Sequence, residues 1–273
     1  MATLARDGLS LHYDVEGKGT PILFIQGCGV GGEGWRPQLD VLGKTHEVAA
    51  FDNRGYGRSS PTNDVTVQAM TADVVALMDT LGWGSAHVVG HSLGGIIAQQ
   101  FAFDQPARVR SLSLLCTFVR GRDGARPSAW MLWKAICMRV GTRASRRRAF
   151  LEMVMPAAAL EAGDPAALAE RLGKLFGRDL ADQPGVIMKQ VQALGAHDTS
   201  ARLAELSTIP TLVVSAEHDR VAPVAQGKAL AEAIGTARYV EIAGAAHGVT
   251  IQMAEVINEL VGKHVAAVDE ASA

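Results

Sequence analysis

Cysteine is scarce in this chain of 273 residues, which contains only Cys28, Cys116 and Cys137. Three scattered cysteines without a Cys-x-x-Cys pair predict neither a disulfide framework nor the ligand spacing of a zinc site. The eight histidines also lack the spacing of metal ligands, so we expect no metal.

An excess of charge of one sign and a long apolar run are also missing. Lys and Arg number 26 against 28 Asp and Glu, a formal net charge of −2, which does not favour a nucleic-acid partner. The short basic cluster at residues 146–148 is typical of a solvated helix face. No run reaches the length of a membrane span, and the first residues lack the pattern of a signal peptide. We expect a cytoplasmic protein without a membrane partner, either a monomer or a homodimer.

Apolar runs of strand length alternate with segments of helical periodicity. With 48% hydrophobic residues, the chain suits one large domain with room for an insertion. Strands that alternate with helices predict an α/β fold with a mostly parallel sheet flanked by helices. The predicted strands are residues 9–15, 21–25, 46–52, 86–89, 109–116, 211–216 and 238–242, and the clearest helices are residues 35–42, 67–81 and 250–265.

The alternation stops in the middle of the chain. From residue 118 to residue 206 there is no clear strand, only helix-like segments interrupted by Gly and Pro. We interpret residues 118–206 as a helical cap inserted into a sheet domain made of residues 1–117 and 207–273.

A Gly-x-Ser-x-Gly motif, Gly90 to Gly94, follows the apolar run 86–89 and precedes a helix-compatible run. This context of strand, sharp turn and helix is that of a nucleophile elbow, with Ser92 as the nucleophile. Glycines suit such a strained turn because chain segments approach each other where a Cβ would push them apart. The alternative is an ordinary glycine-containing turn that holds a serine.

A serine hydroxyl needs a base to remove its proton and an acid to orient that base. Asp219 follows the predicted strand 211–216, and His247 follows the predicted strand 238–242. Functional residues of open α/β sheets collect just past the carboxyl ends of strands, and serine, acid, histidine is the chain order of elbow-type hydrolases. Glu217 and Asp198 are the alternative acids.

Other histidines compete for the role of base. His91 adjoins the serine, but neighbours on a tight turn point in different directions, so we expect it to pack beneath the turn. His218 adjoins the predicted acid and does not share its direction. His197 precedes Asp198, which suits the N-cap of the helix-like segment 199–206. His247 is therefore the predicted base.

The oxyanion of a tetrahedral intermediate needs donors that are already in place. One is the backbone N–H of Leu93, after the nucleophile, and we expect the other from Cys28, in the loop after the strand 21–25. Cys28 as a nucleophile is a weaker alternative, because neither an elbow nor a base is evident beside it.

The loop at residues 27–32 also matches Gly-x-Gly-x-x-Gly, with Asp52 ending the next strand, as in a dinucleotide site. The last glycine of that motif should open a helix, but Gly34 and Pro37 follow here. The dinucleotide interpretation would also leave the serine, aspartate and histidine unexplained, so we expect no cofactor.

The cap offers apolar side chains that could form the walls of a substrate pocket, since Met fills irregular surfaces well. Apolar residues at helical spacing are core by default, so we expect about half of them to pack the cap instead. The predicted pocket residues are Gln26, Gly27, Trp130, Trp133, Met153 and Val221, and further cap candidates are Met131, Met138, Phe150 and Met155.

These motifs together resemble the α/β-hydrolase superfamily over essentially the whole chain. The motif around Ser92 is similar to its elbow, residues 51–59 resemble its Asp-x-Arg-Gly-x-Gly-x-Ser segment, and the loops of Asp219 and His247 match its acid and histidine loops. The resemblance implies a supporting, non-catalytic role for Asp52 and Arg54. The usual His-Gly of the oxyanion loop is Gln26-Gly27 here, which leaves open what Gln26 touches.

The resemblance is strongest to small bacterial esterases and enol-lactonases with a helical cap. It implies a cofactor-free serine hydrolase whose partner is a small ester or lactone, cleaved through an acyl-enzyme. C–C bond hydrolases and perhydrolases keep the same serine and remain alternatives, whereas relatives that use aspartate as nucleophile do not fit Ser92. A non-catalytic small-molecule-binding protein of the same fold is a further alternative, because fold alone does not determine function.

Overall fold

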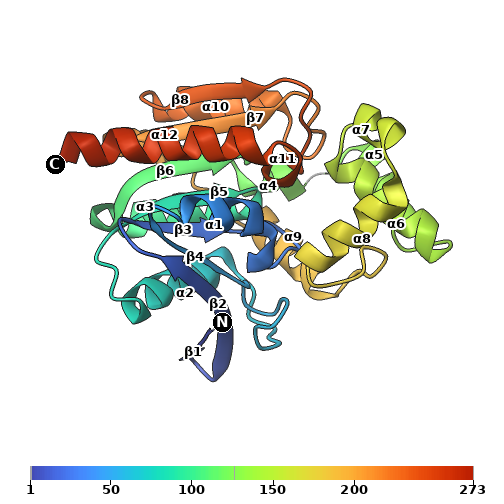
Figure 1. The fold of residues 1–273 in the computed structure, drawn as a ribbon, viewed down its shortest axis with the longest axis horizontal. Helices are drawn as coiled ribbons and strands as arrows, with labels where there is room; N and C mark the ends of the chain where they lie inside the picture. Colours follow the sequence, from blue (N-terminus) through green and yellow to red (C-terminus); the bar gives the residue numbers. More distant parts are fainter. Residues whose placement is uncertain (1, 126, 273) are drawn as a thin grey trace.

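An eight-stranded sheet forms the centre of the computed structural model, which describes residues 2–125 and 127–272 (Figure 1). The strand order is β1-β2-β4-β3-β5-β6-β7-β8. Strand β2 pairs antiparallel with both of its neighbours, β1 and β4, and all the remaining pairs are parallel. This sheet is the mostly parallel α/β architecture that the sequence predicts. The strands are β1 (Ala2–Arg6), β2 (Leu9–Gly17), β3 (Pro21–Ile25), β4 (Glu47–Phe51), β5 (Ala86–His91), β6 (Val109–Leu115), β7 (Thr211–Ala216) and β8 (Arg238–Ile242).

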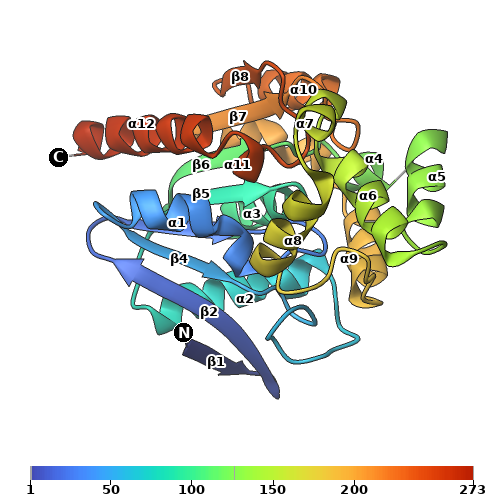
Figure 2. The same ribbon diagram turned by 45° about the vertical axis from the view of Figure 1, so that its right-hand side comes forward.

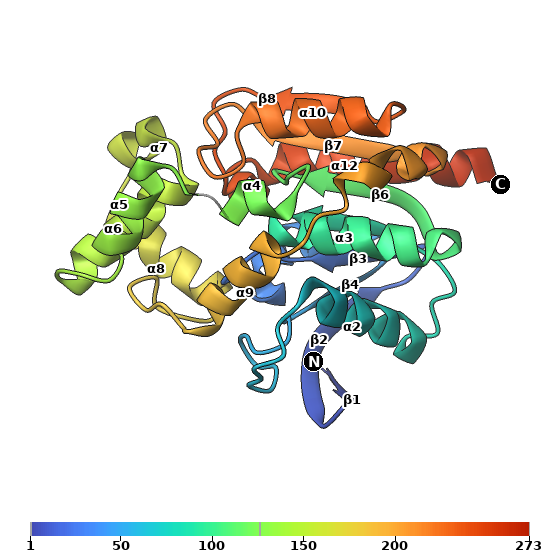
Figure 3. The same cartoon turned by 180° about the vertical axis from the view of Figure 1, so that it is seen from behind.

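Helices cover both faces of the sheet. Helices α1 (Arg36–Leu42), α11 (Val249–Gln252) and α12 (Ala254–Ser272) lie on the face seen in Figure 1. Figure 3 shows α2 (Val67–Thr80), α3 (Leu93–Asp104) and α10 (Val224–Ile234) on the opposite face. Because both faces are covered, the central strands can be continuously apolar, and Ile22 to Ile25 of β3 are fully buried.

Helices and a 3-10 segment occupy the chain between β6 and β7, and no strand occurs there in the described residues. Figure 1 shows α5 to α8 grouped beyond one end of the strands, and Figure 2 shows the same group turned toward the viewer. Leu151, Leu160 and Leu172 are core residues of a separate small apolar cluster within these helices. The elements are α4 (Gly121–Ala125), α5 (Ala129–Cys137), α6 (Arg143–Val154), α7 (Ala157–Ala162), α8 (Pro165–Leu175), α9 (Val186–Gly195) and the 3-10 segment Ser200–Thr208.

Side chains at the helix starts explain where several of these helices begin. The Ser128, Thr142 and Asp164 side chains each accept a hydrogen bond from a backbone N–H in the first turn of α5, α6 and α8 respectively. Such caps satisfy N–H groups that have no partner within the helix. In the part of the chain that the structure describes, no helix is both long and apolar enough to cross a membrane.

The first strand, β1, is absent from the sequence prediction. It forms a hairpin with β2 through Asp7 and Gly8, whose φ angles of 49° and 75° suit a two-residue turn of type I′. The Asp-Gly pair is a local hairpin signal that could have revealed it. The predicted last helix, 250–265, is two helices, α11 and α12, the second of which continues to Ser272.

Candidate active site

Ser92 lies between β5 and α3 with φ 55° and ψ −120°, a strained conformation for a residue with a side chain. The surrounding chain holds it there. Its N–H donates to the Leu115 carbonyl at 3.0 Å, and its carbonyl accepts from the Gly95 N–H at 3.0 Å and the Thr117 hydroxyl at 2.7 Å. The backbone of the serine is therefore fixed by the end of β6 and the first turn of α3.

Glycines allow this close approach. A Cβ on Gly94 would lie 2.0 Å from the Ile25 carbonyl oxygen, and one on Gly90 would lie 2.3 Å from the Gly94 carbonyl oxygen. A Cβ on Gly27 would lie 3.0 Å from the Ser92 Cβ. The loop after β3 and the turn after β5 thus touch each other through glycines, as an elbow requires.

The structure brings the predicted serine, histidine and aspartate together from three separate loops. The Ser92 Oγ lies 3.1 Å from the His247 Nε2, and the His247 Nδ1 lies 2.7 Å from the Asp219 Oδ2. The other carboxylate oxygen of Asp219 accepts from the N–H groups of Val221 and Ala222, both at 2.8 Å. All three residues are more than nine-tenths buried. The chain thus places a hydroxyl, an imidazole and a carboxylate in series.

The alternative acids lie elsewhere and have other partners. Glu217 is exposed and accepts from the Gly244 N–H at 2.8 Å. Asp198 accepts from the N–H of Ser200 at 3.0 Å, but the N-cap of the 3-10 segment Ser200–Thr208 is Thr199, not Asp198 as predicted. Neither carboxylate hydrogen-bonds a histidine among the described residues.

The competing histidines are also placed differently. The His91 Nε2 donates to the His247 carbonyl at 2.9 Å, and burial lowers the pKa of His91 to about 3, so its ring is neutral. His197 contacts Gln68, 3.4 Å from its Nδ1, and His218 is exposed beside Glu217. His91 therefore supports the histidine loop from beneath the turn.

Hydrogen bonds on either side of Cys28 fix the loop after β3. The Gln26 Oε1 accepts from the Gly27 N–H and the Gln190 Oε1 from the Gly29 N–H, both at 2.9 Å. Leu93 opens α3, where N–H groups have no acceptor within the helix. The N–H groups on both sides of the predicted donor Cys28 are thus hydrogen-bonded to glutamine side chains. The Gln26 side chain, whose contacts the sequence left open, binds the backbone of its own loop.

The Cys28 side chain is a poor candidate for a nucleophile. Burial raises the pKa of its thiol to about 12, and the thiolate is the reactive form. No histidine hydrogen bond to it occurs in the described part of the chain. Only the backbone of Cys28 suits the site.

A cavity of about 540 Å³ opens beside Ser92 and His247. Four of the predicted pocket residues line it: Gln26, Gly27, Met153 and Val221. Most of its other walls are apolar side chains of the cap, and they include the further candidates Met131, Met138, Phe150 and Met155. Its size and apolar walls suit a small organic molecule.

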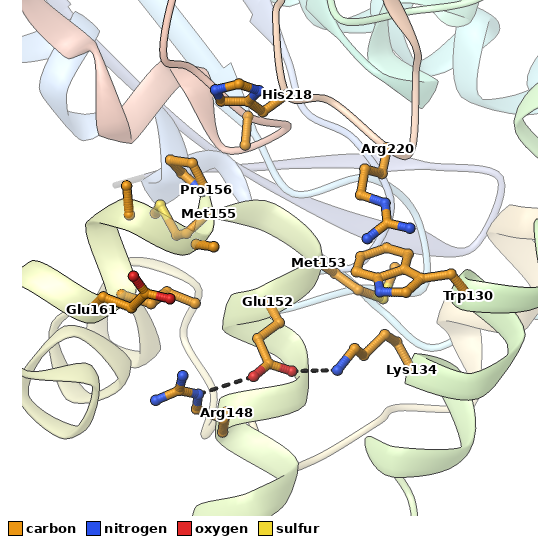
Figure 4. Close-up of a pocket in the computed structure, with 14 residues that line it drawn as sticks. Trp130, Lys134, Arg148, Glu152, Met153, Met155, Pro156, Glu161, His218 and Arg220 are labelled. Atoms are coloured by element: carbon orange, nitrogen blue, oxygen red, sulfur yellow. Dashed lines mark hydrogen bonds and ion pairs between the residues drawn. The ribbon is translucent and has the colours of Figure 1, made fainter.

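The two tryptophans do not line this cavity, which corrects the prediction for both. Trp133 lies on the outward face of α5 and is 59% exposed. Trp130 lines a neighbouring groove of about 470 Å³, where the Arg220 guanidinium lies over its ring at 3.8 Å from the ring centre (Figure 4). In the same groove Glu152 lies between Lys134 and Arg148 and pairs with both. Trp130 therefore contacts the Arg220 loop beside the cavity at Ser92 and does not line that cavity.

The charged side chains in the segment after β4 make structural contacts, with the backbone and with each other. The Asp52 carboxylate accepts from the N–H groups of Gly32 at 2.7 Å and Arg58 at 2.9 Å. Arg54 forms a two-pronged ion pair with the buried Asp73, with both distances 2.7 Å. Because Asp52 is buried and engaged with the backbone, it is not available for a ribose hydroxyl. Among the described residues, no group of three or more His, Cys, Asp or Glu could hold a metal ion.

Several contacts of the site were missed by sequence reasoning. Thr117 holds the serine carbonyl, and Gln190 of α9 reaches Gly29 across 161 residues of chain. Burial, and after it the charge of Asp219, raises the pKa of the Cys116 thiol. No local motif marks these residues, because each acts through a contact that only the folded chain creates.

Comparisons with known proteins agree with this architecture. A family model described as the alpha/beta hydrolase fold matches residues 20–252. RutD from Azorhizobium caulinodans, named for carbamate hydrolysis, is 33% identical over 255 residues, with 92% of each chain covered. BpoC from Mycobacterium tuberculosis, named as a non-heme bromoperoxidase, is 30% identical over 269 residues, 95% of this chain and 99% of that one.

Solved structures give the same result. The enol-lactonase from Burkholderia xenovorans LB400 superposes with a TM-score of 0.81 at 28% sequence identity, covering 97% of this chain and 100% of that chain. The chain therefore belongs to the α/β-hydrolase fold family, as the resemblance of its motifs predicts. The family and these relatives support a hydrolase.

The turn at Ser92 should not tolerate a side chain at Gly94. We expect Gly94→Ala to lower the free energy of unfolding by about 1–3 kcal/mol, because the new Cβ meets the Ile25 carbonyl. Gly84→Ala is the control, since a Cβ there has no neighbour within 4 Å. Chemical denaturation measures both variants, and an equal effect of the two would contradict the steric argument.

The Cys28 thiol should react slowly with iodoacetamide at neutral pH. With a pKa of about 12, the thiolate fraction stays small and rises about tenfold per pH unit up to that value. Peptide mapping by mass spectrometry after timed labelling between pH 7 and pH 9 follows this residue alone. Complete labelling of Cys28 within minutes at pH 7 would show an activated thiol and reopen its role as nucleophile.

Proposed function

We propose that this chain is a cofactor-free serine hydrolase that cleaves a small carboxylic ester or lactone through an acyl-enzyme. The observation that carries the proposal is the pair of contacts from the Ser92 Oγ to the His247 Nε2 and from the His247 Nδ1 to Asp219. These contacts occur at the wall of an apolar cavity, and the serine sits in a strained elbow.

In the first half of the reaction, His247 takes the proton of the Ser92 hydroxyl through Nε2 as the Oγ attacks the substrate carbonyl carbon. The oxyanion that forms accepts from the backbone N–H groups of Leu93 and Cys28. Asp219 accepts from the His247 Nδ1–H, which fixes the tautomer and stabilises the imidazolium. The imidazolium then protonates the leaving alkoxide as the C–O bond breaks, so an acyl-serine and an alcohol result.

In the second half, water replaces the alcohol. His247 takes a proton from the water as its oxygen attacks the acyl carbon, and the same two N–H groups stabilise the oxyanion. When the intermediate collapses, the proton returns to the Ser92 Oγ and the carboxylic acid leaves. For a lactone, the alcohol and the acid are two ends of one product.

The names of two relatives fit an attack on an acyl carbonyl. RutD is named for carbamates and the Burkholderia protein is an enol-lactonase, and both bonds present an acyl carbon to a nucleophile. BpoC, named as a bromoperoxidase, favours a second candidate for the same serine. In that reaction hydrogen peroxide would replace water in the second half, a perhydrolysis.

The first test is turnover of short- and medium-chain p-nitrophenyl esters and of several lactones. We expect Ser92→Ala to lower kcat by at least about 10³-fold, because the attacking oxygen is lost. Circular dichroism checks that the variant is folded. Turnover that persists in Ser92→Ala would show that another group is the nucleophile, and added peroxide distinguishes perhydrolysis by the peracid formed.

The choice of acid is tested with a matched pair of substitutions. We expect Asp219→Asn to lower kcat by about 10³-fold or more, because an amide does not hold the His247 tautomer. Asp198→Asn changes the same chemical group at an exposed position that hydrogen-bonds Ser200, and it should stay within about threefold of wild type. Steady-state kinetics on one ester measures both, and equal losses would remove Asp219 from its role.

A further inference from the structure

The charged side chains that line the cavity beside Ser92 are all positive. Arg139 and Arg178 line it, and no Asp, Glu or Lys belongs to the described lining. The remaining wall is mainly apolar, and the reacting Ser92 and His247 lie in it. A cation in such a wall creates a positive potential inside a cavity of low polarity, where charges interact more strongly than in water.

Arg178 is held in place by neutral acceptors. Its Nε donates to the Tyr56 hydroxyl at 3.0 Å, and its Nη1 donates to the carbonyls of Asp182 at 2.6 Å and Asp179 at 3.3 Å. Its Nη2 donates to the Gly29 carbonyl at 3.4 Å. These bonds orient the guanidinium, but a carbonyl or hydroxyl does not neutralise its charge.

The two nearest acids in sequence are already paired with other arginines. The Asp179 carboxylate binds Arg147 and Arg143. The hydrogen bond from Arg147 is the main reason that the pKa of Asp179 lies well below its usual range. The Asp182 carboxylate pairs with Arg143 at 3.2 Å. Arg178 therefore has no carboxylate partner among the described residues, although two aspartates lie within four positions of it.

Arg178 contacts the loop that holds the predicted oxyanion donor. Its Nη2 reaches the carbonyl of Gly29, the residue after the predicted oxyanion donor Cys28. Only one hydrogen bond leaves Nη2 within the described part of the chain, so a second N–H of this nitrogen has no protein acceptor there. The guanidinium also lies 5.2 Å from the ring centre of Phe150, another wall residue.

We infer that Arg178 binds an anionic group of the substrate, so that the preferred esters or lactones carry a free carboxylate. The inference rests on the proposed serine mechanism and names its substrate class. A carboxylate is costly to bury in an apolar cavity unless a cation with hydrogen bonds receives it. A guanidinium fixed in position pairs well with a carboxylate, because its planar N–H groups match the two oxygens.

The test compares two p-nitrophenyl esters of similar length, the glutarate monoester with a free carboxylate and the neutral hexanoate. The readout is the ratio of kcat/KM for the anionic ester to that for the neutral ester, after subtraction of the uncatalysed rates. We expect Arg178→Gln to lower this ratio by about 10- to 100-fold, as for loss of a charge-assisted hydrogen bond. Arg178→Lys should restore part of it, because the charge remains but the fork does not.

The matched control is Arg148→Gln. Arg148 belongs to the same group of helices, is exposed, and pairs with Glu152 outside the cavity lining and away from Asp179 and Asp182. The ratio should not change in this variant. If Arg178 were merely structural, its loss would lower turnover of both esters together, and an unchanged ratio in Arg178→Gln would overturn the inference while leaving the Ser92 mechanism intact.

A binding measurement separates this inference from the proposed function. In calorimetry, glutarate should bind Ser92→Ala, and binding should be lost in Ser92→Ala with Arg178→Gln. Glutaramide, the neutral diamide, should not bind. If Ser92→Ala kept full turnover, the serine mechanism would fail, yet the glutarate result would still decide whether Arg178 forms an anion site. No glutarate binding at millimolar concentration to either the wild type or Ser92→Ala would overturn it, and this holds even if Arg178→Gln fails to fold.

Discussion

The strained turn at Ser92 is the constraint on which the rest of the site depends. Its positive φ persists only because the surrounding structure over-determines it. The partners that hold it, Leu115 and Thr117, come from the end of β6, and Ile25, which crowds Gly94, ends β3. Strands β3 and β6 are the two neighbours of β5 in the sheet. The parallel order β3-β5-β6 is therefore a requirement of this turn, since antiparallel neighbours would bring their other ends to it.

The helices between β6 and β7 do more than cover one end of the strands. Gln190 of α9 fixes the N–H of Gly29 in the oxyanion loop, and the Gly248 N–H, beside His247, donates to the Val154 carbonyl of α6 at 2.7 Å. The loops that carry Cys28 and His247 thus take part of their hydrogen bonding from the helices between β6 and β7. A displacement of α6 or α9 would disturb the loops as well as the cavity walls, so substrate fit and catalytic geometry are coupled through the same elements.

The sequence predicts the core well and the cap poorly, for a physical reason. Strands β3, β7 and β8 have the predicted bounds, because apolar runs between turn residues are local signals, and the elbow motif carries its own context. Helix α5 is apolar around most of its surface, so its period does not tell which face is inward. Trp133 faces outward while Met131 lines the cavity, and only packing against the core decides between them. Gln190 carries no local signal at all.

The arginines of α6 are solvated side chains that also decide, in the folded chain, which acids are left for Arg178. By sequence, residues 146–148 are a solvated face, and Arg147 is indeed partly exposed. In the fold, Arg143 and Arg147 take the carboxylates of Asp179 and Asp182, whose backbone carbonyls are left to orient Arg178. Ion pairs near the surface contribute little to stability by themselves. By pairing with the nearby acids, however, they leave Arg178 in the cavity wall without a carboxylate partner among the described residues.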